Sequence, residues 1–244
     1  NSFRYNVLDI AITRILYLLY DKIIFYTKQS LEKALMMNLI KPSRAFFANN
    51  TIFTKEVDMV YKFSVPSSDK CKILFIGRLI ENKNLNILFQ YYHELKNMIS
   101  KSNKIVELDI IGDGPLRNLV IENIKKDKSI RWLGALESES EIKKHMINAN
   151  FVFNPGHSGL HINHAFSYGR PYITIYRPNH APEIDYLIDG FNGYVLEGDK
   201  INDLNKLKSI VLNNNNEIYR NAYTTGKKLS IDSWCDQVVN ALKT

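Results

Sequence analysis

The sequence predicts an α/β protein built on a doubly wound parallel sheet. Its apolar runs, such as 71–76 and 106–111, are short and rich in Ile, Leu and Phe, as expected for strands buried on both faces. Between these runs, apolar residues recur at helical spacing, as Leu85, Leu88 and Tyr92 do. Strands that alternate with helices in this way are typical of a parallel sheet with helices on both sides.

The expected elements can be placed in order along the chain. We expect strands at residues 21–27, 44–48, 71–76, 106–111, 130–133, 151–153, 172–175 and 194–196. Helices are expected at residues 29–39, 85–99, from Pro115, and 138–149, where Ser138 and Glu141 form a capping box. From Ile201 onward the pattern is helical only.

Two segments before the regular alternation have a different pattern. Val7–Tyr20 is apolar, but Asp9 and Arg14 interrupt it and it is too short to span a bilayer, so we expect a buried helix. Val65–Asp69 contains Pro, Ser and Asp, and we expect a linker there.

Composition limits the classes of function. A chain of 244 residues holds one domain and part of another. Its two cysteines, Cys71 and Cys235, are far apart, which argues against a disulfide framework and favours a cytoplasmic protein. The net charge of +7 comes from scattered basic residues without an aromatic-basic motif, so we expect no nucleic-acid partner. A solvated lysine-rich surface and contact with an anionic membrane surface both remain open.

Glycine and polar residues gather where predicted strands end. In a doubly wound sheet, ligands bind beyond the carboxyl ends of the strands, and glycine there lets a ligand approach the backbone. These strand ends carry Gly77-Arg78, Gly112–Pro115, Gly134, Asn154–Leu160 and His180–Glu183. The sequence therefore predicts one ligand site along this edge.

Two other kinds of site, for a dinucleotide and for a metal, are less well supported by these residues. Gly112 and Gly114 follow a strand, but Arg117 stands where a dinucleotide fingerprint needs its third glycine. His157, His161, His164 and His180 could suggest a metal, but no Cys, Asp or Glu stands alongside, so we expect no metal site.

Five segments between residues 65 and 200 carry a resemblance to a known family. They are IGRLIENKNL (76–85), IIGDGP (110–115), RWLG (131–134), GLHINHAFSYGRP (159–171), and PE (182–183) with DGFNG (189–193). In this order and spacing they resemble the glycogen-synthase-like group of retaining glycosyltransferases, the glycosyl transferases group 1. The resemblance implies a GT-B architecture of two Rossmann-like domains, of which this chain carries the donor-binding half.

The resemblance also implies roles for individual residues. Arg78 and Lys83 would act catalytically on the leaving diphosphate, where fixed cations stabilise developing charge. Leu133 and Gly134 would lie beside the base, and Gly159 and Leu160 would open a helix towards the phosphates. Other expected donor-binding residues are Gly77, Gly112, Gly114, Gly156, His157, Ser158, His164 and Glu183, the last near the sugar. Since no Asp-x-Asp pair is present, we expect donor binding without a metal.

The sequence departs from the family at two positions. The family has two glutamates eight positions apart around the glycine-rich turn, one for the sugar and one for the ribose hydroxyls. Gly156 and His164 occupy these places here. His164 can replace only part of the ribose contact, so a homologue that binds donor without catalysis is an alternative.

The resemblance divides the chain into three parts. Residues 1–64 would be the last portion of the acceptor-side domain, 65–222 the donor-binding domain, and 223–244 a helix that crosses back. Because the earlier acceptor-side strands are missing, we expect uncovered apolar surface around Ile15, Leu18 and Leu19 and no transfer by this chain alone.

The expected function is transfer of a sugar, with retention, from a UDP-linked donor to a cell-surface glycan or lipid-linked acceptor. The expected location is cytoplasmic, with a peripheral position on the inner face of the membrane left open. The alternatives are a nucleotide-sugar-binding module without activity and a sugar-nucleotide epimerase of the same architecture.

Overall fold

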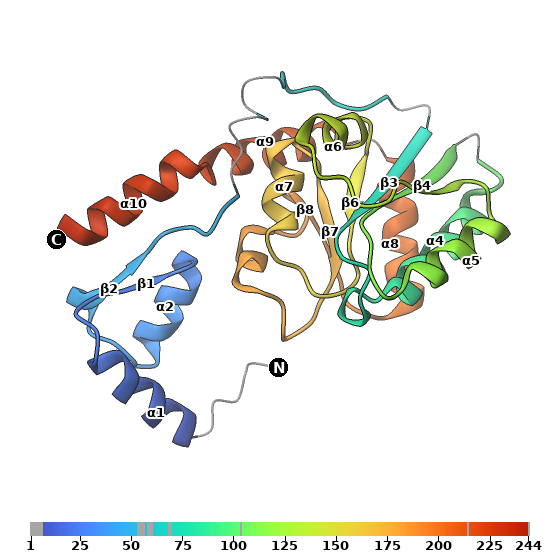
Figure 1. The fold of residues 1–244 in the computed structure, drawn as a ribbon. Helices are drawn as coiled ribbons and strands as arrows, with labels where there is room; N and C mark the ends of the chain where they lie inside the picture. The colour runs from blue at the N-terminus through green and yellow to red at the C-terminus, as the bar shows by residue number, and fades with distance from the viewer. Residues whose placement is uncertain are drawn as a thin grey trace.

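The computed structural model describes residues 7–52, 57, 61–67, 70–102, 104–213 and 215–243 (Figure 1). Its main feature is a parallel six-stranded sheet in the order β5-β4-β3-β6-β7-β8. The strands are β3 (Lys70–Ile76), β4 (Ile105–Ile111), β5 (Ile130–Trp132), β6 (Phe151–Phe153), β7 (Tyr172–Ile175) and β8 (Gly193–Leu196). The chain order reverses between β3 and β6, as in a doubly wound sheet, so the predicted fold class is confirmed.

Helices cover both faces of this sheet (Figure 1). One core contains α4 (Leu85–Ile99), α5 (Arg117–Lys126) and α8 (Lys200–Leu212). The other contains α6 (Glu139–Met146), α7 (His161–Ser167) and α9 (Asn216–Lys228). β3 contributes to both cores, since Ile73 and Phe75 face one and Leu74 and Ile76 face the other.

A smaller unit precedes the sheet. It consists of α1 (Val7–Leu18), β1 (Ile23–Phe25), α2 (Lys28–Met36), the short 3-10 helix η1 (Pro42–Arg44) and β2 (Ala45–Phe47). β1 and β2 form a parallel pair, and Thr27 caps α2 by accepting from the backbone N–H of Ser30.

The last helix, α10 (Ile231–Lys243), returns to this smaller unit (Figure 1). Lys22 donates to the carbonyls of Ala241 and Leu242 at 3.0 and 3.2 Å, and Asn49 N–H donates to Gln237 Oε1 at 2.8 Å. A cation at the C-terminus of a helix satisfies carbonyls that the helix leaves unpaired. The last helix is therefore joined to the smaller unit by hydrogen bonds from Lys22 and Asn49.

Most predicted elements lie within a few residues of those observed, and two differences are informative. Ser138 caps α6 by accepting from Glu141 N–H as expected, but the helix ends at Met146 rather than Ala149. The boundary expected at residue 222 falls inside α9. Val65–Ser67 form neither helix nor strand, and the rest of the expected linker, Ser68 and Asp69, lies outside the described residues.

The expectation that Val7–Tyr20 is a buried helix is wrong. α1 is helical, but Ile15, Leu18 and Leu19 are 61, 69 and 73% exposed. The apolar pattern predicts a face that favours burial, whereas burial requires a neighbour, and the described residues place none over this face. The uncovered apolar surface expected here is confirmed. None of the described helices is long and apolar enough to cross a membrane.

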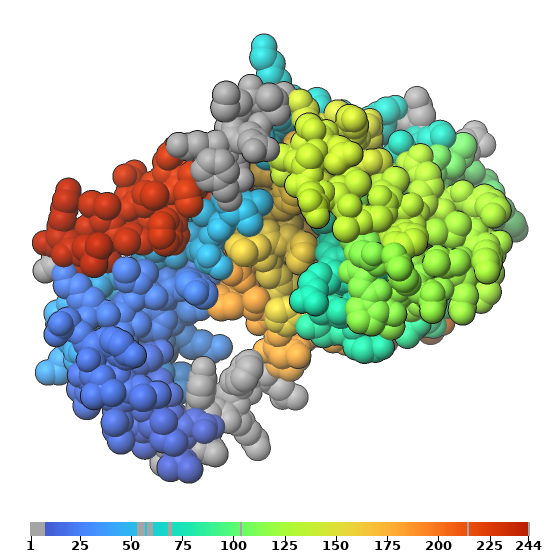
Figure 2. Space-filling view, viewed as in Figure 1, coloured from blue at the N-terminus to red at the C-terminus, as the bar shows by residue number. Residues whose placement is uncertain are grey.

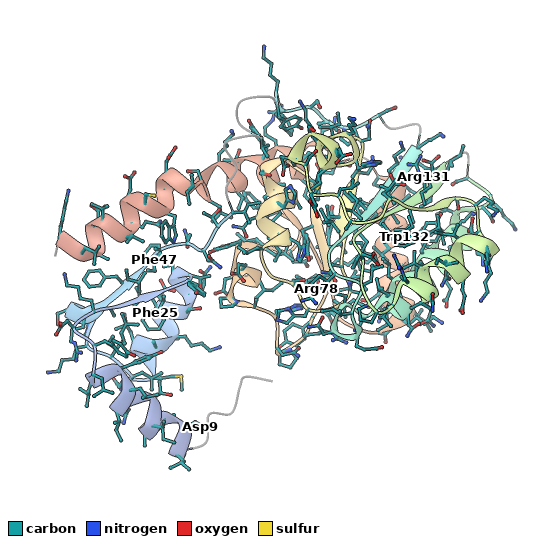
Figure 3. All side chains as sticks on the ribbon, in the orientation of Figure 1. Asp9, Phe25, Phe47, Arg78, Arg131 and Trp132 are labelled. Carbon is teal, nitrogen blue, oxygen red and sulfur yellow. The ribbon has the colours of Figure 1, made fainter. Side chains whose placement is uncertain are left out.

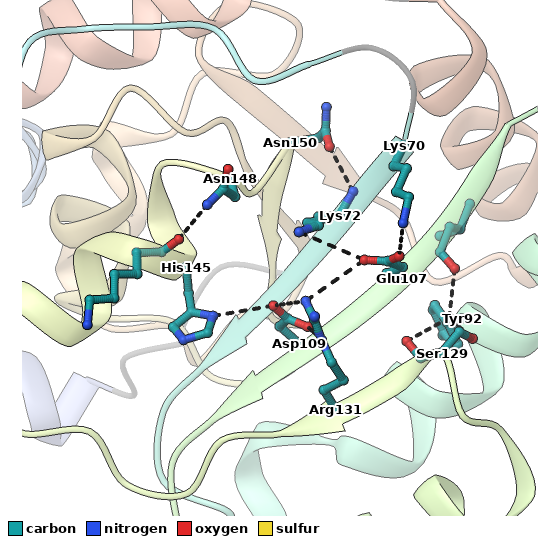
Figure 4. A network of polar contacts seen from close by, with 12 residues as sticks. Lys70, Lys72, Tyr92, Glu107, Asp109, Ser129, Arg131, His145, Asn148 and Asn150 are labelled. Atoms are coloured by element: carbon teal, nitrogen blue, oxygen red, sulfur yellow. Dashed lines mark hydrogen bonds and ion pairs between the residues drawn. The ribbon is translucent and has the colours of Figure 1, made fainter.

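Charged residues cover part of one sheet face beside α6 (Figure 4). Arg131 binds Asp109 through two hydrogen bonds of 2.7 and 2.8 Å, and Lys70 donates to Glu107 at 2.8 Å. The hydrogen bond and charge of Lys70, followed by the charges of Lys72 and Arg131, hold the pKa of Glu107 below its usual range despite partial burial. His145 of α6 lies 3.5 Å from Asp109, so the helix meets this part of the sheet with a polar side chain.

Candidate functional site

The loops that leave β3, β4 and β6 interlock at the carboxyl edge of the sheet. Gly77 N–H donates to Ile111 O at 3.0 Å, and Leu79 N–H donates to Asp113 O at 2.9 Å. His157 N–H donates to Asn82 O at 2.7 Å, which ties the loop after β6 to the loop after β3. The predicted strand ends therefore form one bonded surface.

Glycine is required where these loops cross. A Cβ added at Gly112 would lie 1.8 Å from Gly77 O, and one added at Gly114 would lie 2.6 Å from Leu79 O. At Gly156 it would lie 2.2 Å from Asn82 O. Because they lack a side chain, these three glycines allow the backbone of a neighbouring loop to pass in close contact. The sequence did not predict this role.

Two other glycines leave open space instead. No described atom lies within 4 Å of a Cβ built at Gly134, in the turn after β5. At Gly159 the nearest are ordinary contacts, 3.6 Å to Ala181 Cβ and 3.8 Å to Glu183 Oε2. Leu133, before Gly134, packs against the core of α6 and α7, while Leu160 is 37% exposed.

The two expected cations lie at the end of β3 in different environments. Arg78 is exposed at the lower end of the sheet in Figure 3, and its guanidinium has no bonding partner among the described residues. Lys83, in the 3-10 helix η2 (Glu81–Lys83), is buried, and its Nζ donates to His157 O at 2.6 Å. Burial lowers the pKa of Lys83 to about 8. Both groups keep N–H donors available to an anion.

The turn after β6 is fixed by a hydrogen bond to His180, in the loop after β7. Ser158 N–H donates to His180 Nδ1 at 3.0 Å, so the second ring nitrogen, 2.9 Å from Ile175 O, carries the proton. Ser158 Oγ receives a hydrogen bond of 3.0 Å from Tyr172. His157, beside it, is half-buried. His180 is therefore a structural residue of this turn.

His164 is paired with a carboxylate that the sequence analysis did not identify. Its Nε2 lies 2.9 Å from Glu139 Oε1, and Tyr168 donates to the same oxygen at 2.5 Å. Burial opposes ionisation of Glu139, but these two hydrogen bonds and the nearby imidazole keep its pKa below the usual value. Glu139 begins α6, so the loop that contains Gly134 leads directly to it.

Glu183 lies between the donor-side domain and the smaller unit. It is buried in the 3-10 helix η3 (Pro182–Tyr186) and accepts a hydrogen bond from Asn50 Nδ2. Thr27 donates to Asp185 at 2.5 Å, and the Tyr186 hydroxyl donates to Tyr26 O at 2.9 Å. η3 is therefore one of the contacts between the two units, and Glu183 Oε2 faces Gly159.

A groove of about 570 Å³ opens beside this contact. Figure 2 shows an opening between the blue N-terminal unit and the orange segments. The groove is lined by β1, α2 and the loop before η3, with side chains that include Tyr17, Tyr26, Lys33, His180 and Asp185. Among the described residues, no group of three or more His, Cys, Asp or Glu side chains could hold a metal ion.

With this geometry in place, comparison with known proteins identifies the family. Residues 70–213 match the family described as glycosyl transferases group 1. The chain belongs to this family. The match covers the whole sheet and the interlocked loops, so the expected family, glycosyl transferases group 1, is confirmed. A search of curated proteins by sequence found no match.

Several solved structures share the fold. One is a Staphylococcus aureus TarM mutant in complex with fondaparinux, α-GlcNAc-glycerol and UDP. The alignment covers 100% of this chain and 49% of the TarM chain, with TM-score 0.71 and 16% identity. The lipopolysaccharide outer core galactosyltransferase WaaB matches 99% of this chain over 65% of its own, with TM-score 0.71 and 17% identity. Anabaena HepE in complex with UDP matches 98% of this chain over 68% of its own, with TM-score 0.70 and 13% identity. The chain spans about half the length of TarM, and these likenesses establish the GT-B fold.

Proposed function

We propose that this chain binds the nucleotide-sugar donor of a retaining glycosyltransferase and that the whole protein transfers the sugar to a cell-surface glycan or lipid-linked acceptor. The observation that carries the proposal is the pair of cations at the end of β3. Arg78 offers an exposed guanidinium, and Lys83 is buried with one N–H engaged. TarM and HepE were solved with UDP, which supports a UDP-linked donor.

In this proposal Arg78 and Lys83 contact the diphosphate. Negative charge grows on that group as the glycosidic bond breaks, and fixed cations stabilise it most in a site with little water. Lys83 cannot swing away, because its Nζ is bonded to His157 O and its stem is buried. Arg78 is the more mobile contact, able to follow the diphosphate as it leaves.

The remaining expected residues would contact different parts of the nucleotide sugar. Leu133 and Gly134 would lie beside the base, where Gly134 leaves open space. His164 would meet the ribose together with Glu139, which it already binds. Gly159 and Leu160 would meet the phosphates, and Glu183 would lie near the sugar. We propose that these contacts bind the donor without a metal.

The acceptor would approach from the groove beside η3, since its aromatic and polar side chains suit a glycan. A peripheral position on the inner face of the membrane completes the proposal, supported by the net charge of +7. A second candidate is donor binding without catalysis, favoured by Gly156 and His164 at the positions of the family's glutamates.

A thermal-shift panel of UDP, GDP and ADP, followed by donor hydrolysis and transfer assays on the whole protein, tests these proposals. We expect UDP to raise Tm most, and the whole protein to release free UDP from its donor and to glycosylate a lipid-linked acceptor. A UDP-dependent shift without hydrolysis or transfer would favour the binding module. Conversion of the donor sugar with no acceptor present would favour the epimerase, and no shift with any nucleotide would overturn the donor site.

A further inference from the structure

His161 is a polar side chain without a partner inside the candidate site. It is the first residue of α7, and its ring is half-buried. Its Nδ1 is fully buried and has no hydrogen-bond partner, and its Nε2 has none among the described residues. Buried polar atoms are nearly always hydrogen-bonded, so an exception calls for an explanation.

The ring lies beside the residues proposed to hold the diphosphate. A Cβ built at Gly77, where β3 ends, would lie 3.2 Å from His161 Nε2 and 3.7 Å from Lys83 Cε. Gly77 therefore leaves room for the imidazole to stand against the end of β3. Gly77 and Lys83 lie in the loop after β3, and the fold brings His161 of α7 against them.

The charged and titratable groups around His161 are cations and imidazoles. Burial, followed by the charge of Lys83 and the rings of His164 and His157, lowers the pKa of His161 to about 4. The imidazole is therefore neutral at pH 7, with one N–H donor and one acceptor nitrogen. The nearby His157 carbonyl already accepts from Lys83. No described oxygen accepts a hydrogen bond from the His161 ring, so a ligand oxygen can take this place.

We propose that His161 is a third contact to the donor diphosphate, donating its ring N–H to a phosphate oxygen beside Lys83. The inference rests on the proposed function, because it takes the ligand at this edge to be a nucleoside diphosphate. A neutral donor suits this position, since it adds a hydrogen bond without adding a third charge next to Lys83 and Arg78. Because the fully buried Nδ1 has no acceptor, the ring proton is carried by Nε2, the nitrogen that faces Gly77, and it is the Nε2–H that donates to the phosphate.

Three variants of the chain test the inference by titration calorimetry. His161→Leu keeps a similar volume and removes both nitrogens, and His161→Gln keeps an N–H donor. His145→Leu is the matched control, a half-buried imidazole on α6 whose Nδ1 lies 3.5 Å from Asp109. Each protein is titrated with the diphosphate that binds wild type best among UDP, GDP and ADP, and with the matching monophosphate and nucleoside.

We expect His161→Leu to weaken diphosphate binding about tenfold, the size of one hydrogen bond to a charged group. Nucleoside binding should stay within about twofold of wild type, because the contact is to phosphate. His161→Gln should recover to within about threefold of wild type, and His145→Leu should bind as wild type does. Tm of the unbound His161→Leu protein should equal or exceed that of wild type, because the variant removes an unsatisfied polar group.

The outcomes separate this inference from the proposed function. If wild type binds none of the nucleotides, the proposed function fails and the inference fails with it. If wild type binds and His161→Leu binds equally well, the inference alone is overturned. Equal loss of nucleoside and diphosphate binding in His161→Leu, or a lowered Tm without ligand, would show that the ring only supports the fold.

Discussion

The two ends of the candidate site differ in how closely the backbone is packed. Around Gly77, Lys83 and Gly156 the loops cross so closely that an added Cβ would meet backbone atoms at 2.2–2.4 Å at Gly156. Around Gly134 an added Cβ would meet no described atom within 4 Å. The first end holds Lys83 in place through its bond to His157 O, and the second leaves open space beside Gly134.

This difference shows that glycine serves two purposes along one sheet edge. At the packed end it allows loops to interlock and so fixes Lys83 against His157 O. At the open end it leaves a surface on which a flat base could lie. Substitutions at the packed end should therefore affect stability, whereas those at the open end should affect binding.

Gly156→Ala gives the largest expected effect and tests the packed end. The methyl group would overlap the backbone of Asn82 and Lys83, so the two loops must separate. We expect a loss of about 3 kcal/mol or more in the free energy of unfolding, measured by urea denaturation. Gly159→Ala, three positions along the same turn, meets ordinary contacts only and should cost less than about 1 kcal/mol. Equal stability of the two variants would refute the packing described here.

Gly134→Asn tests the open end. Gly134 has φ +72°, a left-handed conformation that Asn tolerates better than most residues. The variant should stay within about 1 kcal/mol of wild type in urea, while nucleotide affinity falls about tenfold or more because the side chain enters the base position. Unaltered affinity in calorimetry would show that the base lies elsewhere.

The pKa of Lys83 predicts a pH dependence with opposite signs for folding and binding. Burial lowers this pKa from 10.5 to about 8, so the folded protein loses the proton more readily than the unfolded chain. This group alone therefore makes the fold more stable as pH rises from about 8 to 10.5. Diphosphate binding needs the charged form, so calorimetry should show affinity that falls as pH rises above 8. Lys83→Arg stays charged, and its affinity should be flat between pH 7 and 9; a parallel fall in both proteins would remove Lys83 as the cause.

Glu139→Gln gives the smallest expected effect. One oxygen of Glu139 is held by His164 and Tyr168, and the other is left for a ribose hydroxyl, a group that carboxylates bind in related sheets. We expect the variant to weaken UDP binding about threefold and to lose the preference for UDP over 2′-deoxy-UDP. Glu141→Gln, also in the first turn of α6 but exposed, should change neither. A preference that survives in Glu139→Gln would exclude this contact.

The sheet could be predicted from sequence because its signals are local. Continuous apolar runs gave the strands, and Ser138 with Glu141 marked the start of α6. The edge of the sheet at which we expect a ligand follows from the doubly wound topology alone. The helix at Val7–Leu18 was predicted, but its exposure was not, because burial depends on neighbours that no local pattern describes.

Much of the site detail could not be predicted, because it arises from contacts between distant residues. Glu139 is joined to His164 across 25 positions, and in the sequence Glu139 looks like an ordinary residue in the first turn of a polar helix. His161 stood out only as one of four histidines, and its position against Gly77 comes from the fold. The sequence analysis assigned the glycines at 112 and 156 to a donor site, and their position where two loops cross is visible only in the fold.

The most direct test of the account is titration calorimetry of UDP, in the presence of EDTA, against wild type, Arg78→Ala and Lys83→Ala. The account predicts that wild type binds without metal and that each variant loses about 1.5–3 kcal/mol of binding free energy, the size of a charge-assisted hydrogen bond. Unchanged affinity in both variants, or binding that returns only when Mg²⁺ or Mn²⁺ is added, would contradict it.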